Sequence, residues 1–263
     1  MITAGIDIGS RTIKKVLMDD SGVIDYVITD TGVDPLSNVL KMLKHQEHDN
    51  IVATGYGRYL AQMHLQCPII TEIKAYAIGA NFLFPDCRTV LDIGGQDSKI
   101  IRVRNGKVED FEMNDKCAAG TGKFLEVMAT TLGFTLDEFG NISSRADQAV
   151  PISSMCTVFA ESEIVSLISS GADRKNISLG LHQSILNRII ALMGRTGFEE
   201  PIVFAGGVAK NECIAKLLRS KLKMKILLPP EPQIVGAIGS ALVAKQEITS
   251  DYTGRKNQKP KGV

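Results

Sequence analysis

Several features that mark common classes of protein are missing from this chain of 263 residues. It has no tryptophan, and no apolar run is long enough to span a membrane. The N-terminal segment lacks the basic and apolar regions of a secretory signal, so we expect a cytoplasmic location. A net charge of +1 gives no electrostatic basis for binding nucleic acid. We therefore expect a soluble globular protein with neither a membrane nor a nucleic-acid partner.

The five cysteines form no C-x-x-C pair, and their number is odd. Both facts argue against a secreted disulfide framework and against a self-contained zinc finger. Cys67, Cys87 and Cys213 border apolar runs, where we expect buried free thiols. Cys117 in NDKCAAGTGKFLEV and Cys156 in VPISSMCTVFAESEI lie instead in glycine-rich and serine-rich loops. These two cysteines indicate a metal or redox centre.

A unit of strand, glycine turn, second strand and hairpin occurs twice in the chain. It covers residues 2–29 and returns over 89–113, where the hairpin turns at Asn105-Gly106. Two copies of one unit predict a duplicated, two-lobed α/β architecture. We expect three parts: a first lobe over residues 1–86, completed by a C-terminal helix at about 233–246; a second lobe with the cysteines over 87–232; and a flexible tail over 247–263.

In both copies an aspartate precedes the glycine turn, Asp7 in GIDIGSRT and Asp92 in LDIGGQDSK. Glycine lets a phosphate approach backbone N–H groups, and a nearby carboxylate can hold hydrated Mg²⁺. Either motif alone is common where strands turn, but their repetition indicates a nucleotide site. We expect Asp7 and Asp92 to hold Mg²⁺ through water. The residues expected to line the phosphates are Gly9, Ser10, Thr12, Gly94, Gly95 and Gln96.

Three residues could orient the water that attacks the phosphate, namely Gln96, Asp97 and Glu161, and the sequence does not choose among them. For Glu161 a solvated helix face is an equal alternative. Lys14 and Lys15 also lie near the first turn. They belong to an expected strand on which at least one should point to solvent, so we do not place them in the site.

A third glycine signature, IVFAGGVAKNECIAKLL, predicts a strand that ends at two glycines and enters a helix. This arrangement is suited to lie against an adenosine. In PEPQIVGAIGSALVA, two glycines spaced three apart on a helix allow close packing. The residues expected near the nucleoside are Gly206, Gly207, Val208, Asn211, Gln233 and Gly236.

The order of these motifs resembles the actin, heat-shock-chaperone and sugar-kinase ATPase superfamily, with its ribonuclease-H-like fold. Five segments narrow the resemblance: DIGGQDSK, NDKCAAGTGKFLEVMA, PISSMCTVFAESEI, FAGGVAKN and PPEPQIVGAIGSAL. Together they resemble the activators (archerases) of 2-hydroxyacyl-CoA dehydratases, in the family that includes the ATP-binding subunits of benzoyl-CoA reductase. The resemblance extends to about Lys245. One departure is Arg11, where many relatives have a small residue.

The resemblance implies an ATPase that drives low-potential, single-electron transfer. Reduced ferredoxin or flavodoxin would supply the electron, and an iron-sulfur acyl-CoA dehydratase, a benzoyl-CoA reductase or a double-cubane protein would receive it. A 4Fe-4S cluster takes four thiolates, whereas one chain offers Cys117 and Cys156. Two chains supply four, which predicts a homodimer with one bridging cluster on its two-fold axis. We expect both thiolates at helix N-termini, where N–H groups stabilise negative sulfur.

Three alternatives remain open from the sequence. A zinc ion bound by four cysteines satisfies the same ligand count. A small-molecule kinase of the same superfamily would need a carboxylate base, for which Asp115 or Asp137 could serve, but it would leave both cysteine loops unexplained. A non-enzymatic, ATP-dependent regulator would use its metal only to hold the dimer together.

Overall fold

The computed structural model of the chain describes residues 1–44, 48–154 and 156–256. It separates into two compact units, Met1–Leu83 with Gln233–Val263, and Phe84–Pro232. The first boundary lies after Leu83, where a helix ends, whereas the sequence placed it after Asp86. In the described parts of the chain, no helix is both long enough and apolar enough to cross a bilayer.

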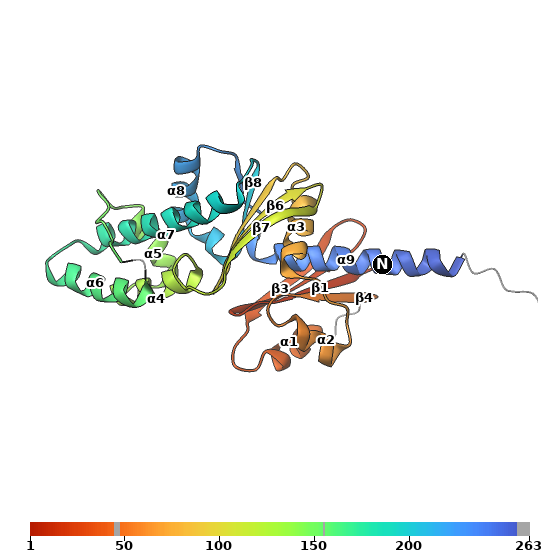
Figure 1. Cartoon of the computed structure of the whole chain (residues 1–263). Coiled ribbons are helices and arrows are strands. Elements are labelled where there is room, and N and C mark those ends of the chain that lie inside the picture. The colour runs from red at the N-terminus through yellow and green to blue at the C-terminus, as the bar shows by residue number, and fades with distance from the viewer. Residues whose placement is uncertain (45–47, 155, 257–263) are drawn as a thin grey trace, which may run out of the picture. The chain divides into compact units, whose positions relative to one another are not determined.

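The first unit is a four-stranded sheet in the order β3-β2-β1-β4, with strands β1 and β4 parallel and the other pairs antiparallel. Helices α1 and α2 pack on one face through Val39 and Ala61, and helix α9 packs on the other through Ala237 and Ala241 (Figure 1). Its elements are β1 (Thr3–Ile8), β2 (Thr12–Met18), β3 (Val23–Asp30), α1 (Pro35–Leu43), β4 (Asn50–Thr54), α2 (Arg58–Leu65), α3 (Glu72–Leu83) and α9 (Val235–Lys256).

The second unit repeats this order as β7-β6-β5-β8, with the short β9 added at the edge. Leu91, Ile100 and Phe204 on one face of the sheet join a core formed with the helices. The turn at Asn105-Gly106 has φ values of 52° and 72°, as a tight hairpin requires. The elements are β5 (Thr89–Ile93), β6 (Ser98–Arg104), β7 (Lys107–Asn114), α4 (Gly122–Leu132), α5 (Leu136–Ser143), α6 (Thr157–Ser169), α7 (Arg174–Thr196), β8 (Ile202–Ala205), α8 (Glu212–Leu222) and β9 (Ile226–Leu227).

The matching strand orders of the two sheets confirm the duplicated α/β architecture. In each copy, three antiparallel strands are followed by a strand that pairs in parallel with the first of them. The loop after the first strand is therefore placed alike in both units. We name these loops the first loop (residues 8–12) and the second loop (residues 93–97).

Glycines allow close packing of helices α3 and α9, which the sequence predicted for Gly236 and Gly239 without a partner helix. A Cβ atom on Gly239 would lie 1.9 Å from the carbonyl oxygen of Ala75, and one on Gly79 would lie 2.0 Å from that of Val235. Gly5 on β1 meets α9 in the same way, 1.9 Å from the oxygen of Ala237. Because backbone atoms occupy the space that a Cβ atom would need, none of the three positions accepts a side chain.

Helix α9 extends to Lys256, although the sequence placed the start of a flexible tail at residue 247. No proline lies between the start of α9 and Pro260, so the backbone can continue its hydrogen-bonding pattern. Residues 257–263 of the expected tail lie outside the described residues.

Candidate functional site

Asp7 is the penultimate residue of strand β1, directly before the first loop, and is 1% exposed. One carboxylate oxygen accepts a hydrogen bond from Lys14 Nζ at 3.2 Å, across the β1-β2 ladder. The other oxygen, Oδ1, is buried and has no hydrogen-bond partner among the described residues. Gly55, with φ of 87°, leaves space beside Oδ1, because a Cβ atom at this position would lie 2.4 Å from that oxygen. A buried carboxylate oxygen without a protein donor fits a site for hydrated Mg²⁺.

Asp92 repeats this arrangement beneath the second loop and is also 1% exposed. Its Oδ2 accepts a hydrogen bond from Lys99 Nζ at 3.1 Å, and Lys99 lies 2.7 Å from the carboxylate of Asp97. Gly206, with φ of 83°, stands where Gly55 stands in the first unit, and a Cβ on it would lie 2.5 Å from Asp92 Oδ1. Each unit thus brings together an aspartate, a lysine and a glycine that leaves the space beside the carboxylate free of a side chain.

The sequence interpretation missed Lys14, Lys99 and Gly55. We left out Lys14 and Lys15 because we expected at least one of them to point to solvent. That expectation is wrong, since Lys14 is 8% exposed and Lys15 is 1% exposed. Lys14 and Lys15 point to opposite faces of the sheet, and helices cover both faces, so neither side chain reaches solvent. Lys14 donates a hydrogen bond to Asp7, and Lys15 donates one to the carbonyl oxygen of Met42. The signal was present, since a lysine follows the aspartate at the same distance in both repeats.

The residues expected to line the phosphates lie in the two loops. In the first loop, Gly9 N donates to Thr12 O at 3.1 Å, and Ser10 is exposed. In the second loop, Gly94 N donates to Asp97 O at 2.9 Å, while Gly94 and Gly95 are partly exposed. Both turns are closed by backbone hydrogen bonds, which holds their remaining N–H groups in place for an anion.

The three candidates for orienting water differ in their surroundings. Gln96 is exposed at the tip of the second loop, whereas the carboxylate of Asp97 is paired with Lys99. Glu161 lies on α6 and accepts a hydrogen bond from Thr131 at 3.5 Å, near the C-terminal end of α4. The second loop contacts α4 at Lys123, roughly 12 Å away along the helix axis at 1.5 Å per residue. The structure therefore does not bring Glu161 to the loop, and Gln96 remains the better candidate.

The residues expected near the nucleoside have mixed surroundings. Gly207 is exposed at the start of a 3₁₀ turn (Gly207–Lys210), but Val208 is 5% exposed and packs in the core. Gly206 is buried against Asp92. Gly236 lies at the first aspartate, where a Cβ would be 3.3 Å from Asp7 Oδ2, and Gln233 is half-buried in the turn before α9.

The side chain of Asn211 has a structural task that the sequence did not indicate. Its Oδ1 accepts from Ile214 N at 3.0 Å and caps α8, so its amide nitrogen faces His182 Nε2 at 3.0 Å. His182 Nδ1 lies 2.8 Å from the carbonyl oxygen of Ser178, which can only accept, so Nδ1 carries the proton. The neutral imidazole therefore holds Asn211 and, with it, the start of α8.

This arrangement predicts an acid-dependent loss of stability. Burial lowers the pKa of His182 to about 4, against a weaker opposite effect of its hydrogen bond to the Ser178 carbonyl. The unfolded chain takes up a proton below about pH 6.5 and the folded chain only near 4, so the free energy of unfolding should fall between these values. At about 1.4 kcal/mol per pKa unit, the loss is on the order of 3 kcal/mol.

Urea unfolding at several pH values tests this prediction. The His182→Gln variant should be less stable than the wild type at pH 7 and should show a flatter pH dependence. Replacing the exposed His64 by Gln is the matched control and should leave the slope unchanged. Equal slopes for the wild type and His182→Gln would contradict the role of the buried imidazole.

Cys156 is exposed and is the N-cap residue of α6, as the sequence predicted for a thiolate at a helix N-terminus. The loop before it is held by Glu163, which accepts hydrogen bonds from Ser153 N, Ser153 Oγ and Ser154 N at 2.8–2.9 Å. Burial raises the pKa of Glu163, but these hydrogen bonds together outweigh it and lower the pKa. Glu163 therefore stays ionised and fixes the approach of the chain to Cys156.

Cys117 is half-buried and lies ahead of α4, which has Thr121 as its N-cap residue. A helix follows Cys117 as the sequence predicted, with its N-cap four residues further along the chain. The N–H groups of Gly122 and Lys123 at the start of α4 donate instead to the carbonyls of Gly94 and Gly95, at 2.9 and 2.7 Å. The segment with Cys117 is thus bonded directly to the second loop.

The other three thiols are buried, which confirms the expectation for them. Burial raises the pKa of the Cys87 and Cys213 thiols to about 11 and also raises that of Cys67. Thiols held in the protonated form are poor metal ligands. Within the described residues, no three side chains of His, Cys, Asp or Glu gather as a metal site. Cys117 and Cys156 are thus the two thiols that are at least partly accessible.

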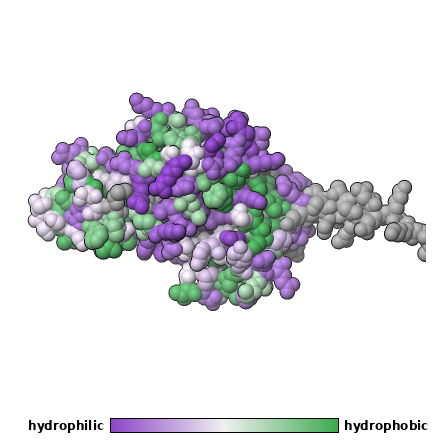
Figure 2. Space-filling view, in the orientation of Figure 1, coloured by the Kyte–Doolittle hydropathy of each residue, from purple (hydrophilic) through white to green (hydrophobic). Residues whose placement is uncertain are grey.

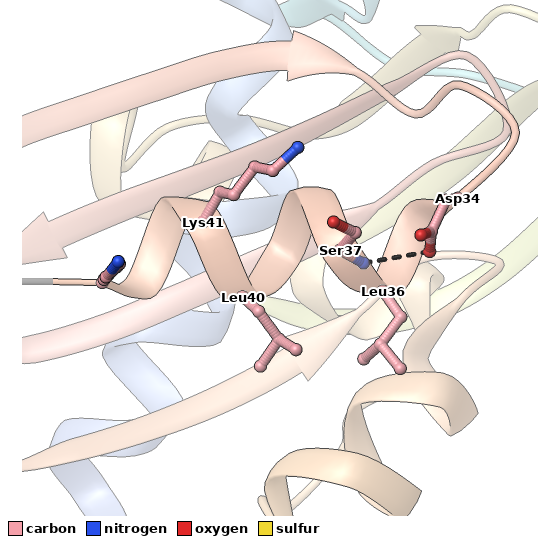
Figure 3. A pocket seen from close by; sticks show the side chains of 6 residues that line it. Asp34, Leu36, Ser37, Leu40 and Lys41 are labelled. Carbon is pink, nitrogen blue, oxygen red and sulfur yellow. Dashed lines mark hydrogen bonds between the residues drawn. The ribbon is translucent and has the colours of Figure 1, made fainter.

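A shallow hollow of about 320 Å³ lies along α1, away from these residues. Figure 3 shows Leu36 and Leu40 on one side of this helix and the hydrogen bond from Ser37 N to Asp34, which caps it at 3.1 Å. All its lining residues come from α1 and the residues flanking it, so no polar groups converge on it from other elements.

Comparison with known proteins gives a consistent result. Residues 4–244 match the family described as the BadF/BadG/BcrA/BcrD ATPase family. The activator of lactoyl-CoA dehydratase from Anaerotignum propionicum is 44% identical over 255 residues, which cover 93% of this chain and 97% of that protein.

Two solved structures are also similar. Component A of the (R)-2-hydroxyglutaryl-CoA dehydratase of Acidaminococcus fermentans has a TM-score of 0.90 and 37% identity, over 95% of this chain and 99% of that one. The activator of the 2-hydroxyisocaproyl-CoA dehydratase from Clostridium difficile, with bound ADPNP, has a TM-score of 0.89 and 37% identity over 100% of both chains. These findings confirm the predicted resemblance and the ATPase fold.

Proposed function

Because the chain belongs to the BadF/BadG/BcrA/BcrD ATPase family, we propose that it is an ATP-dependent activator of a partner enzyme. In this proposal, a homodimer with one bridging 4Fe-4S cluster uses ATP to drive the transfer of single electrons at low potential. Reduced ferredoxin or flavodoxin supplies the electron. The acceptor is an iron-sulfur enzyme such as a 2-hydroxyacyl-CoA dehydratase, the class of enzyme that the similar proteins activate.

The observation that carries this proposal is the contrast among the five thiols. Cys67, Cys87 and Cys213 are buried, while Cys156 is exposed and Cys117 is partly exposed. The accessible pair lies in the two loops that precede α4 and α6, and these helices pack against each other (Figure 1). Two chains would bring four accessible thiolates to one axis, which is the ligand set that a 4Fe-4S cluster takes.

The surface beside Cys156 supports a dimer at this place. Val158 is 66%, Phe159 68% and Val165 55% exposed, and all three lie on α6. Figure 2 shows apolar colour over the part of the second unit where α6 lies in Figure 1. An exposed apolar surface next to a half-complete metal site is suited to pair with a second copy of itself.

The chain's own residues have separable tasks in this proposal. Asp7 and Asp92 would hold Mg²⁺, while Lys14 and Lys99 pair with these carboxylates and fix their orientation beside each loop. Gln96, exposed on the second loop, would orient the attacking water. Cys117 and Cys156 of both chains would hold the cluster, which when bound supplies a one-electron couple. The first N–H groups of α6 would stabilise negative charge on Cys156.

Anaerobic purification tests the proposal. We expect a brown dimer with four iron and four sulfide per two chains, consistent with one 4Fe-4S cluster, and an ATPase that transfers electrons to a dehydratase. A colourless dimer with intact ATP hydrolysis would rule out electron transfer. Hydrolysis that depends on a phosphate acceptor would point instead to a kinase.

The apolar face of α6 gives a separate prediction. Replacing Phe159 by Glu should place a charge in the expected interface, convert the dimer to monomers and release the iron, while each chain keeps its fold. Met63→Glu is the matched control, because Met63 on α2 is 73% exposed and lies in the other unit. Sedimentation and iron content would show the outcome, and a dimeric Phe159→Glu variant with full iron would contradict this interface.

A further inference from the structure

The start of α4 is capped by the second loop rather than by its own N-cap side chain. The first N–H groups of a helix lack partners within the helix, and Thr121 makes no side-chain cap. Gly122 N and Lys123 N donate to Gly94 O and Gly95 O instead. The fit is tight, because a Cβ on Gly122 would lie 3.0 Å from Gly94 O. A shift of the second loop therefore moves the first turn of α4.

The same segment is held at its other end by two strand residues. Ser98 and Asn114 are direct partners across the β6-β7 ladder. Ser98 Oγ donates to Gly120 O, and Asn114 Nδ2 donates to Cys117 O at 2.9 Å and to Ala119 O at 3.1 Å. Asn114 is thus hydrogen-bonded to the backbone of the cysteine itself.

These contacts make residues 117–123 a continuous link, which we call the coupling segment. One end carries the Cys117 thiol. The N–H groups at the other end donate hydrogen bonds to the second loop, which is expected to line the phosphates. The amide of Asn114 is the fixed point against which the segment can move, because β7 is held to β6 along its length.

We propose that Asn114 is a positioning residue that transmits nucleotide occupancy of the second loop to Cys117. The inference rests on the proposed function for the role of Cys117, and it concerns how that cysteine is regulated. With the amide in place, a displacement at Gly94 and Gly95 reorients the Cys117 carbonyl and its thiol. Without the Asn114 amide, the coupling segment can deform between its two ends. A displacement of the second loop then no longer reaches the Cys117 thiol.

The response of the thiol can be measured without a cluster. The reduced, iron-free, full-length chain is treated with iodoacetamide, alone and with Mg²⁺ and either ADP or ADPNP, and alkylation of Cys117 is followed by peptide mass spectrometry. In the wild type we expect saturating nucleotide to change the rate constant by about fivefold or more, the usual lower end of coupling between two sites. In Asn114→Asp, which keeps the shape but removes the N–H donors, the rate constant should no longer respond.

Further measurements separate this role from a merely structural one. Calorimetric titration should show that Asn114→Asp binds nucleotide as the wild type does, and its far-ultraviolet circular dichroism should match that of the control Asn141→Asp, at an exposed position on α5. If Asn114→Asp does not fold, Asn114→Ser, which also removes both Nδ2 hydrogen bonds and adds no charge, takes its place with the same expected loss of response.

The outcomes are distinct. A wild-type chain that binds nucleotide without any change at Cys117, or a variant that responds as the wild type does, overturns the inference and leaves the proposed function to the iron measurement. A chain that binds no nucleotide overturns both. A response in the wild type that disappears in the variant, with nucleotide affinity unchanged, supports the inference.

Discussion

Replacing Cys156 by Ala is expected to remove the iron from the homodimer and to abolish electron transfer to a dehydratase. Each cluster in the proposal takes two thiolates from each chain, so one substitution removes two of the four ligands at once. Cys156 is exposed, so its loss should change the free energy of unfolding by no more than about 0.5 kcal/mol. ATP hydrolysis, which in the proposal depends on the two loops, should persist.

Iron and sulfide analysis, visible absorption and an ATPase assay on anaerobically purified protein would check this. Cys117→Ala should lose iron in the same way. The control is Cys87→Ala, because Cys87 is buried with a raised pKa and should leave the iron content unchanged. A Cys156→Ala dimer that keeps its iron would exclude this cysteine as a ligand. A colourless wild type that contains zinc would favour the structural all-cysteine site instead.

Replacing Asp7 by Asn should cost more stability than the same change at Asp92, although both should reduce ATP hydrolysis about 10²-fold or more, since a bound metal contributes several kcal/mol to such reactions. Lys14 pairs with Asp7 alone among the described residues, whereas Lys99 pairs with both Asp92 and Asp97. Asp7→Asn therefore leaves a buried ammonium without a carboxylate, which costs about 3 kcal/mol or more. Asp92→Asn leaves Lys99 with one carboxylate and should cost less.

Chemical denaturation of the two variants measures this difference. Adding Lys14→Met to Asp7→Asn should recover much of the lost stability, because the unpaired charge is then gone, but it should not recover hydrolysis. Equal destabilisation at both aspartates, or no recovery in the double variant, would contradict the account of the buried pairs.

The duplicated fold could be predicted from the sequence because its signals are local. The hairpin at Asn105-Gly106 needs two residues that tolerate positive φ, and both sit at adjacent positions. The glycines of α9 were predicted to allow close packing; a Cβ on Gly239 would meet the backbone of Ala75 on α3, and one on Gly236 would meet the ring of Tyr76. Asp7 and Asp92 were found as a pair because the same short motif occurs twice.

The burial of Lys14 and Lys15 could not be predicted in this way. Whether a lysine on a strand reaches solvent depends on what covers each face of the sheet, and here α9 returns to the first unit from the far end of the chain. The task of Glu163 is equally non-local, because its partners Ser153 and Ser154 belong to a loop ahead of its own helix. Helical periodicity does not reveal such a contact.

By itself, the sequence determined the two-lobed ATPase fold, the family, the paired aspartates and the two cysteines that differ from the rest. Each of these depends on residue type and on spacing along the chain, which a sequence records directly. Only the tertiary structure decided that both lysines are buried, that Glu161 stands away from the second loop, and that Cys117 is bonded to that loop through the start of α4. These features depend on which segments, distant in sequence, come together to bury apolar surface and to satisfy backbone hydrogen bonds.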